Sequence, residues 1–216
     1  MNQNLNVMNK YIVEFIGTFF LVVAIGLTGN PLAIGAMLMV MVYMGGSISG
    51  AHYNPAVTLA VLMRGKISSM EAAMYMAVQL IGATAAAFFI YLFYHSTFSP
   101  AHDMQHDINI LKPLAIEMVF TFALALVVLS VATSKKNANN SYFGLAIGFT
   151  VMACAFAGGR ISGGAFNPAV GIGPTLIDTF LGNGGSMKYV WVYIVGPFAG
   201  GAVAAIVYKM ANPDEV

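Results

Sequence analysis

The sequence predicts an all-α integral membrane protein, with six transmembrane helices plus two re-entrant half-helices arranged as an inverted repeat. Three observations predict this fold class: the composition, two distinct lengths of apolar run, and a short motif that occurs twice. Hydrophobic residues make up 59% of the 216 residues and charged residues only 8%, against about 25% charged in a typical soluble domain. This composition excludes most soluble folds, and the net charge of +1 gives no support to a nucleic-acid partner.

Six apolar runs are long enough to cross a membrane, which takes about 20 mostly apolar residues. The first run contains Glu14 and is followed by no A-x-A-like cleavage site. We therefore interpret it as a spanning helix and not as a cleaved signal peptide. The six predicted spans are 11–29, 32–49, 70–93, 113–133, 142–159 and 187–209.

Two shorter apolar runs, 54–63 and 167–178, can enter the membrane but cannot cross it. About ten residues at a rise of ~1.5 Å reach only half of the ~30 Å hydrocarbon core. Asn is a good N-cap and Pro is favoured at the first helical position, so the Asn-Pro-Ala box that opens each run is expected to begin a half-helix. The boxes are Asn54-Pro55-Ala56 and Asn167-Pro168-Ala169.

The two boxes belong to an internal repeat with an offset of 113 residues. The segments "GGSISGAHYNPAV" (45–57) and "GGRISGGAFNPAV" (158–170) match at nine of thirteen positions. We place the repeats at about 11–93 and about 113–210, within one domain over 1–216. Each repeat holds three spans, an odd number, so the second repeat must be inverted. Inverted repeats with interrupted segments place a solute path at their interface, near the midplane.

Inversion brings the N-termini of the two half-helices together in the middle of the membrane. Each end carries roughly half a positive charge from the helix dipole, so the pair opposes cations, including hydronium. The Asn54 and Asn167 carboxamides can donate N–H groups to a passing water, which interrupts a proton-conducting file. The stretches before them, 47–53 and 160–166, are expected to be non-helical, which is tolerated at this depth where the backbone lines a wet path.

Glu14 and Glu117 are charged residues inside predicted spans, and they occupy corresponding positions of the two repeats. An intramembrane carboxylate can serve as a proton relay. It can also accept hydrogen bonds from re-entrant backbone and brace it. One carboxylate beside each half-helix favours the bracing role.

These residues resemble the major intrinsic protein family, the aquaporins and aquaglyceroporins. The resemblance rests on both Asn-Pro-Ala boxes, the Glu-x-x-x-Thr-Phe helices at 14–19 and 117–122, the "GPFAGG" segment at 196–201 and the six-plus-two layout, and it covers essentially the whole chain. It implies a right-handed helical bundle, one pore per subunit, a homotetramer, and downhill flow without a cofactor or a bound metal.

The resemblance also implies a selectivity filter at four positions, counted from the Asn of each box: Ile34, Ala155, Gly164 and Val170. Most members carry Arg at the place of Val170, so this chain is an atypical member whose filter is expected to be wide and apolar. The expected function is a passive channel for water and small uncharged solutes (glycerol, urea, ammonia and neutral metalloid acids such as arsenite) that excludes protons and ions. A water-selective channel and a junctional or structural membrane protein with little conductance are the alternatives. An enzyme is not expected, because the midplane offers no nucleophile–base pair.

Three further side chains each have a functional and a structural interpretation. Arg160 could place a charge at the outer mouth, or contact a loop or a lipid headgroup. His52 precedes the first box by two residues and could line the pore, or be a packed, hydrogen-bonded histidine. Cys154 could lie close to the filter beside Ala155, or act as a small buried hydrophobe.

Charge placement predicts the orientation in the membrane. With the N-terminus inside, six of the nine cations fall on the cytoplasmic side, in keeping with the positive-inside rule. We therefore expect cytoplasmic N- and C-termini, the lipid bilayer as partner, and a bacterial-type inner membrane or a plasma membrane as host. The external loop 94–111 carries His102-Asp103 and His106-Asp107, whose spacing could bind a metal but is more typical of a solvated loop.

Overall fold

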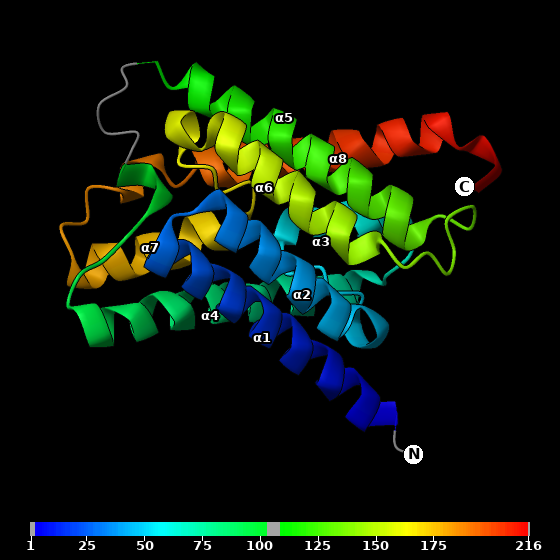
Figure 1. The fold of residues 1–216 in the computed structure, drawn as a ribbon, viewed down its shortest axis with the longest axis horizontal. Coiled ribbons are helices and arrows are strands. Elements are labelled where there is room, and N and C mark those ends of the chain that lie inside the picture. The colour runs from blue at the N-terminus through cyan, green and yellow to red at the C-terminus, as the bar shows by residue number, and fades with distance from the viewer. Residues whose placement is uncertain (1–2, 103–108, 216) are drawn as a thin grey trace.

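The computed structural model of the protein describes residues 3–102 and 109–215, which form a bundle of helices without a strand (Figure 1). Six helices are long and apolar enough to span a membrane, which confirms the predicted all-α membrane fold. The elements are α1 (Gln3–Thr28), α2 (Pro31–Ser49), α3 (Pro55–Met63), α4 (Ser69–Tyr94), α5 (Leu111–Val128) continued by a π-helix (Leu129–Thr133), α6 (Phe143–Ser162), α7 (Pro168–Leu181), α8 (Val192–Ala211), and 3₁₀ turns at Met187–Tyr189 and Pro213–Glu215.

Several boundaries differ from the predicted ones. Helix α1 begins at Gln3 and not at 11, because the polar residues before the apolar run continue the helix. Helices α2 and α6 run on to Ser49 and Ser162, so the non-helical stretches are shorter than the predicted 47–53 and 160–166. Each helix ends at a left-handed glycine, Gly50 at φ 87° and Gly163 at φ 84°, a conformation that glycine adopts without a steric penalty.

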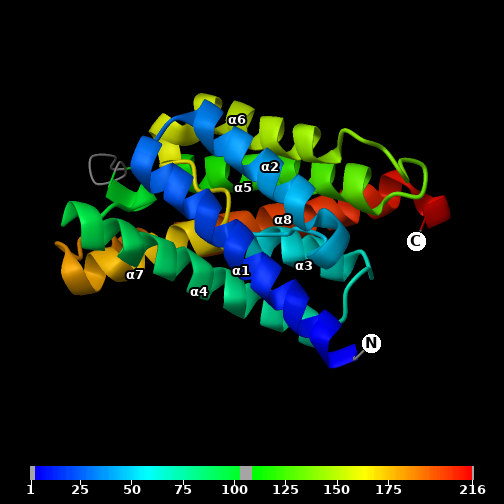
Figure 2. The same cartoon turned by 60° about the horizontal axis from the view of Figure 1, so that its bottom comes forward.

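The short helices point in from opposite ends of the bundle. Both chain termini lie toward one end of the long axis, which we call the inner end, and α3 lies on that side (Figures 1 and 2). Helix α7 lies toward the opposite, outer end. The two half-helices therefore run toward each other, as an inverted repeat requires.

Glycines in equivalent positions set how closely the long helices approach. A Cβ on Gly35 of α2 would lie 2.6 Å from the carbonyl oxygen of Gly148 of α6, and a Cβ on Gly148 would lie 2.5 Å from that of Gly35. Each residue stands in a "LAIG" segment, 113 residues apart. The α2–α6 crossing is thus a contact between the two repeats at which neither helix tolerates a side chain.

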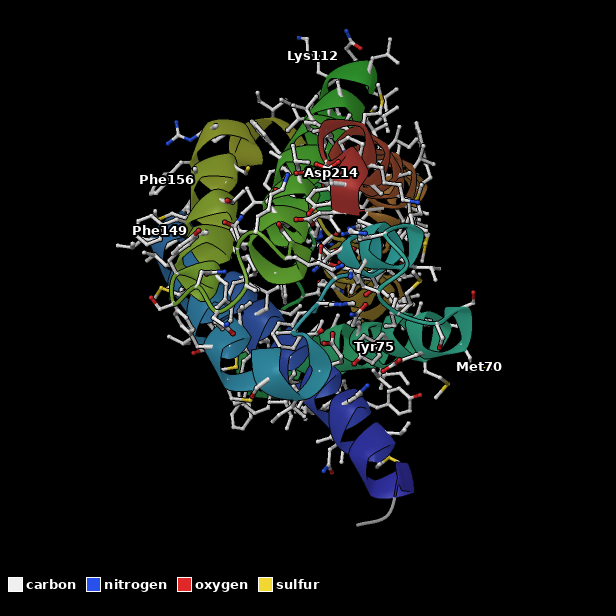
Figure 3. The ribbon with its side chains drawn as sticks, turned by 90° about the vertical axis from the view of Figure 1, so that its right-hand side faces the viewer. Met70, Tyr75, Lys112, Phe149, Phe156 and Asp214 are labelled. Carbon is white, nitrogen blue, oxygen red and sulfur yellow. The ribbon has the colours of Figure 1, made fainter. Side chains whose placement is uncertain are left out.

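The outward surface of the bundle is apolar. Phe149 and Phe156 of α6 point away from the other helices (Figure 3), and they are 52% and 64% exposed. Met70 at the start of α4 is 75% exposed. Large apolar side chains on this scale are stable next to lipid, where no water has to be excluded.

Candidate functional site

The two Asn-Pro-Ala boxes form matching helix starts. Asn54 caps α3 at φ −156°, and its Oδ1 accepts the Ala56 N–H at 2.9 Å. Asn167 caps α7 at φ −160°, and its Oδ1 accepts the Ala169 N–H at the same distance. Pro occupies the first helical position in both cases, where its missing N–H leaves no intrahelical bond unmade.

Each carboxamide also reaches across to the opposite half of the chain. Asn54 Nδ2 donates to the Phe166 carbonyl at 2.9 Å, and Asn167 Nδ2 donates to the Tyr53 carbonyl at 2.9 Å. A carboxamide carries two N–H groups, so these bonds leave one N–H on each Asn for a molecule in the cavity that both residues line.

Glu14 holds the backbone that precedes the first box. Its Oε1 accepts Ser49 Oγ at 2.7 Å and the His52 N–H at 2.9 Å. Its Oε2 accepts the Tyr53 N–H at 2.7 Å and Gln79 Nε2 at 2.8 Å. The side chain is fully buried, so these donors take the place of water around the carboxylate.

Glu117 makes the equivalent contacts in the second half. It accepts Ser162 Oγ at 2.7 Å, the Ala165 N–H at 3.0 Å and the Phe166 N–H at 2.6 Å. Tyr53 and Phe166 have left-handed backbones, at φ 51° and φ 48°, which are unusual for bulky residues and persist only where surrounding contacts hold them. In both halves the bonds from a buried carboxylate supply such contacts.

Three cavities follow one another through the bundle. An outer vestibule of about 410 Å³ reaches from Arg160 down to Ile34 and Val170. A central cavity of about 30 Å³ contains both box asparagines. An inner vestibule of about 470 Å³ extends from His52 to Lys10. Since one water occupies ~30 Å³ of liquid, the central section is a single-file passage between two wide mouths.

The lining of the central cavity is symmetric in sequence. Each residue that lines it from α1, α2, or the segment ending at Val57 has a counterpart in the lining at the repeat offset, which is 103 for α1 and α5 and 113 for the rest. The pairs are Leu21/Leu124, Ile25/Val128, Ile34/Ile147, Leu38/Val151, Ala51/Gly164, His52/Ala165, Tyr53/Phe166, Asn54/Asn167 and Val57/Val170.

Comparison with known proteins decides the family. The model of the MIP (Major intrinsic protein) family matches residues 23–208. This chain belongs to the major intrinsic protein family.

Relatives of this family cover most of the chain. Aquaporin NIP1-1 of Oryza sativa subsp. japonica is 36% identical over 94% of this chain and 74% of its own length. Aquaporin TIP1-2 of Zea mays is 36% identical over 86% of this chain and 71% of its own length. The X-ray structure of the aquaglyceroporin from Plasmodium falciparum shares the fold, with a TM-score of 0.78 over 97% of this chain and 98% of that one, at 23% identity.

The four positions at which the family resemblance places a filter lie at the outer side of the passage. Ile34, Gly164 and Val170 line both the outer vestibule and the central cavity, whereas Ala155 lines the vestibule alone. Arg160, in the last turn of α6, is exposed and lines the same vestibule. The filter positions are therefore apolar and open outward to a wide space, and the narrow section begins below them.

His52 combines the two roles that its sequence position suggested as alternatives. Its ring lines the central cavity and the inner vestibule. Its Nδ1 lies 3.1 Å from Thr58 Oγ1, and Tyr75 packs edge-on against the ring with centroids 5.2 Å apart. The imidazole is thus both packed and accessible from the passage.

Cys154 does not share the position of its neighbour Ala155. It is buried and lines none of the three cavities along the passage. Adjacent helical residues point about 100° apart, so the side chain next to a vestibule residue turns into the bundle. The prediction that placed Cys154 at the filter was wrong for this reason.

The external His–Asp motif is described only in part. His102 Nε2 lies 3.3 Å from Asp178 Oδ1 near the end of α7, while Asp103, His106 and Asp107 lie outside the described residues. Among the residues that the structure describes, no group of three or more His, Cys, Asp or Glu side chains could hold a metal.

Sequence reasoning missed Gln79 and Thr58. Gln79 Nε2 donates to Glu14 and also to Thr58 Oγ1 at 3.1 Å, and both side chains are fully buried. The available signal was a single polar residue inside the otherwise apolar span 70–93. A polar side chain in that setting needs a buried partner, and Glu14 was the nearest candidate by position in the repeat.

Proposed function

We propose that the protein is a passive transmembrane channel for water and small uncharged solutes, with glycerol, urea, ammonia and neutral metalloid acids such as arsenite as the candidate solutes. The observation that carries the proposal is the pair of capped half-helices whose asparagines face one narrow cavity. Asn54 and Asn167 each keep one N–H for the passing molecule. The three successive cavities supply the path.

The same geometry supports exclusion of protons and cations. The positive ends of α3 and α7 both face the central cavity, so the potential there opposes a cation. A water whose oxygen accepts from the asparagines has its hydrogens directed away from the centre, which breaks a continuous proton-conducting file. We assign the backbone on either side of the boxes to Glu14 and Glu117 as braces.

We assign the selectivity filter to Ile34, Ala155, Gly164 and Val170. None of these side chains can replace the water that a polar solute loses, so the section favours solutes that are small and weakly hydrated. The central volume of about 30 Å³ favours a second candidate function, a channel that passes water alone, because one water fills that volume.

Stopped-flow light scattering on proteoliposomes tests the proposal. Vesicles with the protein should shrink and reswell faster than empty vesicles in glycerol and urea gradients, and their water flux should also rise. If water passes but glycerol, urea and arsenite do not, the water-selective alternative holds. If no flux exceeds that of empty vesicles, the channel proposal fails and a junctional role gains support.

Val170→Arg tests the filter assignment. A guanidinium at the floor of the outer vestibule would narrow the passage and add donors that suit water. We expect glycerol flux to fall at least tenfold while water flux changes by less than about threefold, because water still fits the narrowed section. Equal loss of both fluxes in Val170→Arg, with the protein still folded, would reject Val170 as a filter residue.

Arg160→Ala tests the outer charge. If Arg160 repels cations from the outer vestibule, its removal raises the proton leak, measured with a pH-sensitive dye inside the vesicles. An unchanged leak would assign the barrier to the half-helix dipoles alone.

We further propose that both termini face the cytoplasm, as the distribution of cations indicates, and that four copies assemble. The relatives named above are plant proteins, so they lend no support to the expected bacterial-type host membrane. Protease protection of the chain ends in sealed vesicles and the mass of the detergent-solubilised particle test these two statements.

A further inference from the structure

The outer end of the central cavity is bounded by one apolar collar. Ile25, Ile34, Gly164 and Val170 line the central cavity and also the outer vestibule, so they stand where the wide mouth meets the narrow section. We call these four residues the outer collar. A solute that enters from the outer side meets them first.

The repeat maps each member of the outer collar onto a residue at the other end. The counterparts are Val128, Ile147, Ala51 and Val57, and all four line the central cavity. Val128 also lines the inner vestibule, which places this set where the narrow section opens inward. We call these four residues the inner collar.

We propose that the inner collar is a second selectivity determinant, comparable to the outer one, and that Val57 is its counterpart of Val170. This inference rests on the proposed channel function. The two valines occupy the same position, the third residue of α3 and of α7. Each is 2% exposed, and neither offers a hydrogen bond to a solute.

The two collars match in size as well as in chemistry. Going from outer to inner, one Ile becomes Val and one Gly becomes Ala, while one Ile and one Val are kept. The losses and gains nearly cancel in volume. A polar solute therefore sheds hydration at both ends of the cavity of about 30 Å³ with no replacement donors from either collar.

The one polar difference lies beside the inner collar. His52 lines the cavity there, whereas its counterpart Ala165 carries no polar side chain. The ring Nδ1 is engaged with Thr58 Oγ1 at 3.1 Å, so the imidazole adds a single further polar atom to the inner side. This does not widen the collar.

Two comparable barriers in series give a distinctive flux pattern. Widening one of them leaves the other in place, so a single variant raises flux by about twofold at most, whereas widening both removes the limit. A pore with one filter behaves differently, because only the residue at that filter changes the flux.

The experiment compares Val57→Ala, Val170→Ala and the double variant by glycerol flux in proteoliposomes. Val61→Ala is the matched control, since Val61 lies one turn further along α3 and lines the wide inner vestibule. Size-exclusion profiles and protein content per vesicle verify that each variant is folded and inserted. We expect both single variants to exceed the control, each by up to about twofold, and the double variant to exceed the product of the two.

The inference is overturned if Val57→Ala matches the Val61→Ala control while Val170→Ala carries the whole gain of the double variant. Failure of the proposed solute range is a separate result. It shows as wild-type vesicles that pass water and no glycerol, and the same four variants are then compared by water flux, where the same pattern decides for or against the inner collar.

Discussion

The two re-entrant loops have nearly the same backbone but are stabilised by different means. In both, a buried Glu accepts consecutive backbone N–H groups, and a tyrosine hydroxyl donates to the last helical carbonyl, Tyr75 to Ser49 at 2.7 Å and Tyr193 to Ser162 at 2.5 Å. The first loop then adds a polar network. The second adds close packing.

The difference lies at two pairs of equivalent positions. Thr58 and Gln79 of the first half, which hydrogen-bond to each other, correspond to Gly171 and Pro197 of the second. A Cβ on Gly171 would lie 2.2 Å from Tyr193 Cβ. The same turn can therefore be fixed by hydrogen bonds on one side of the pore and by helix contact on the other.

The largest expected effect comes from converting each brace to an amide. Glu117→Gln turns an NH₂ group toward the Phe166 N–H, and nothing nearby can compensate, so we expect a loss of about 3 kcal/mol in unfolding free energy. Glu14→Gln should cost about 2 kcal/mol, because the unpartnered Gln79 Oε1 can accept from the new NH₂ after an amide flip.

Unfolding of the solubilised protein in SDS measures both losses. Glu71→Gln is the control, since Glu71 pairs with Lys10 at a partly exposed site and an exposed ion pair contributes about 0–1 kcal/mol. A larger loss in Glu14→Gln than in Glu117→Gln would contradict the compensating role of Gln79.

A smaller effect separates packing from hydrogen bonding. Gly171→Ala places a methyl group against Tyr193, and overpacking of this kind costs about 1–3 kcal/mol. Thr58→Ser keeps the hydroxyl that joins Gln79 and should cost only about 1 kcal/mol for the lost methyl group. Thermal unfolding monitored by circular dichroism tests this order, and equal shifts in melting temperature would argue against tight packing at Gly171.

The smallest effect concerns the far ends of the half-helices. Arg64 follows α3 and pairs with Glu215 at 3.2 Å, with both side chains 3% exposed. Hydrogen bonds from Tyr208 and Ser134 lower the pKa of Glu215 from 4.5 to about 2. Because the folded-state pKa is the lower one, this contact stabilises the tail above pH 4.5 and is lost as the pH falls from 4.5 toward 2.

Hydrogen exchange of residues 134–141 and 207–215 across that pH window measures the loss. We expect faster exchange at the acid end in the wild type. Glu215→Gln should exchange fast throughout and show no pH step of this origin. Persistence of the step in Glu215→Gln would assign it to another carboxylate.

Hydropathy and the boxes made the fold predictable, because span length and helix caps are local properties of the chain. Contacts between distant segments were less accessible. Nothing near Asn54 indicates that its amide donates to Phe166, and Glu215, close to the end of the chain, looks like a solvated residue until Arg64 is placed beside it. The direction of Cys154 and the narrow central section depend on helix rotation, which the weakly periodic apolar runs do not specify.

The reciprocal asparagine bonds also have a consequence for biosynthesis. Asn54 is translated 113 residues before Asn167, so at roughly 5–20 residues per second its cross-chain partner is missing for on the order of 6–20 s. Every side chain that binds Glu14 lies within the first 79 residues, so that network can form during the delay. The second loop is synthesised beside a finished first half, and this order of synthesis gives a physical reason why the more extensive polar network belongs to the loop that is made first.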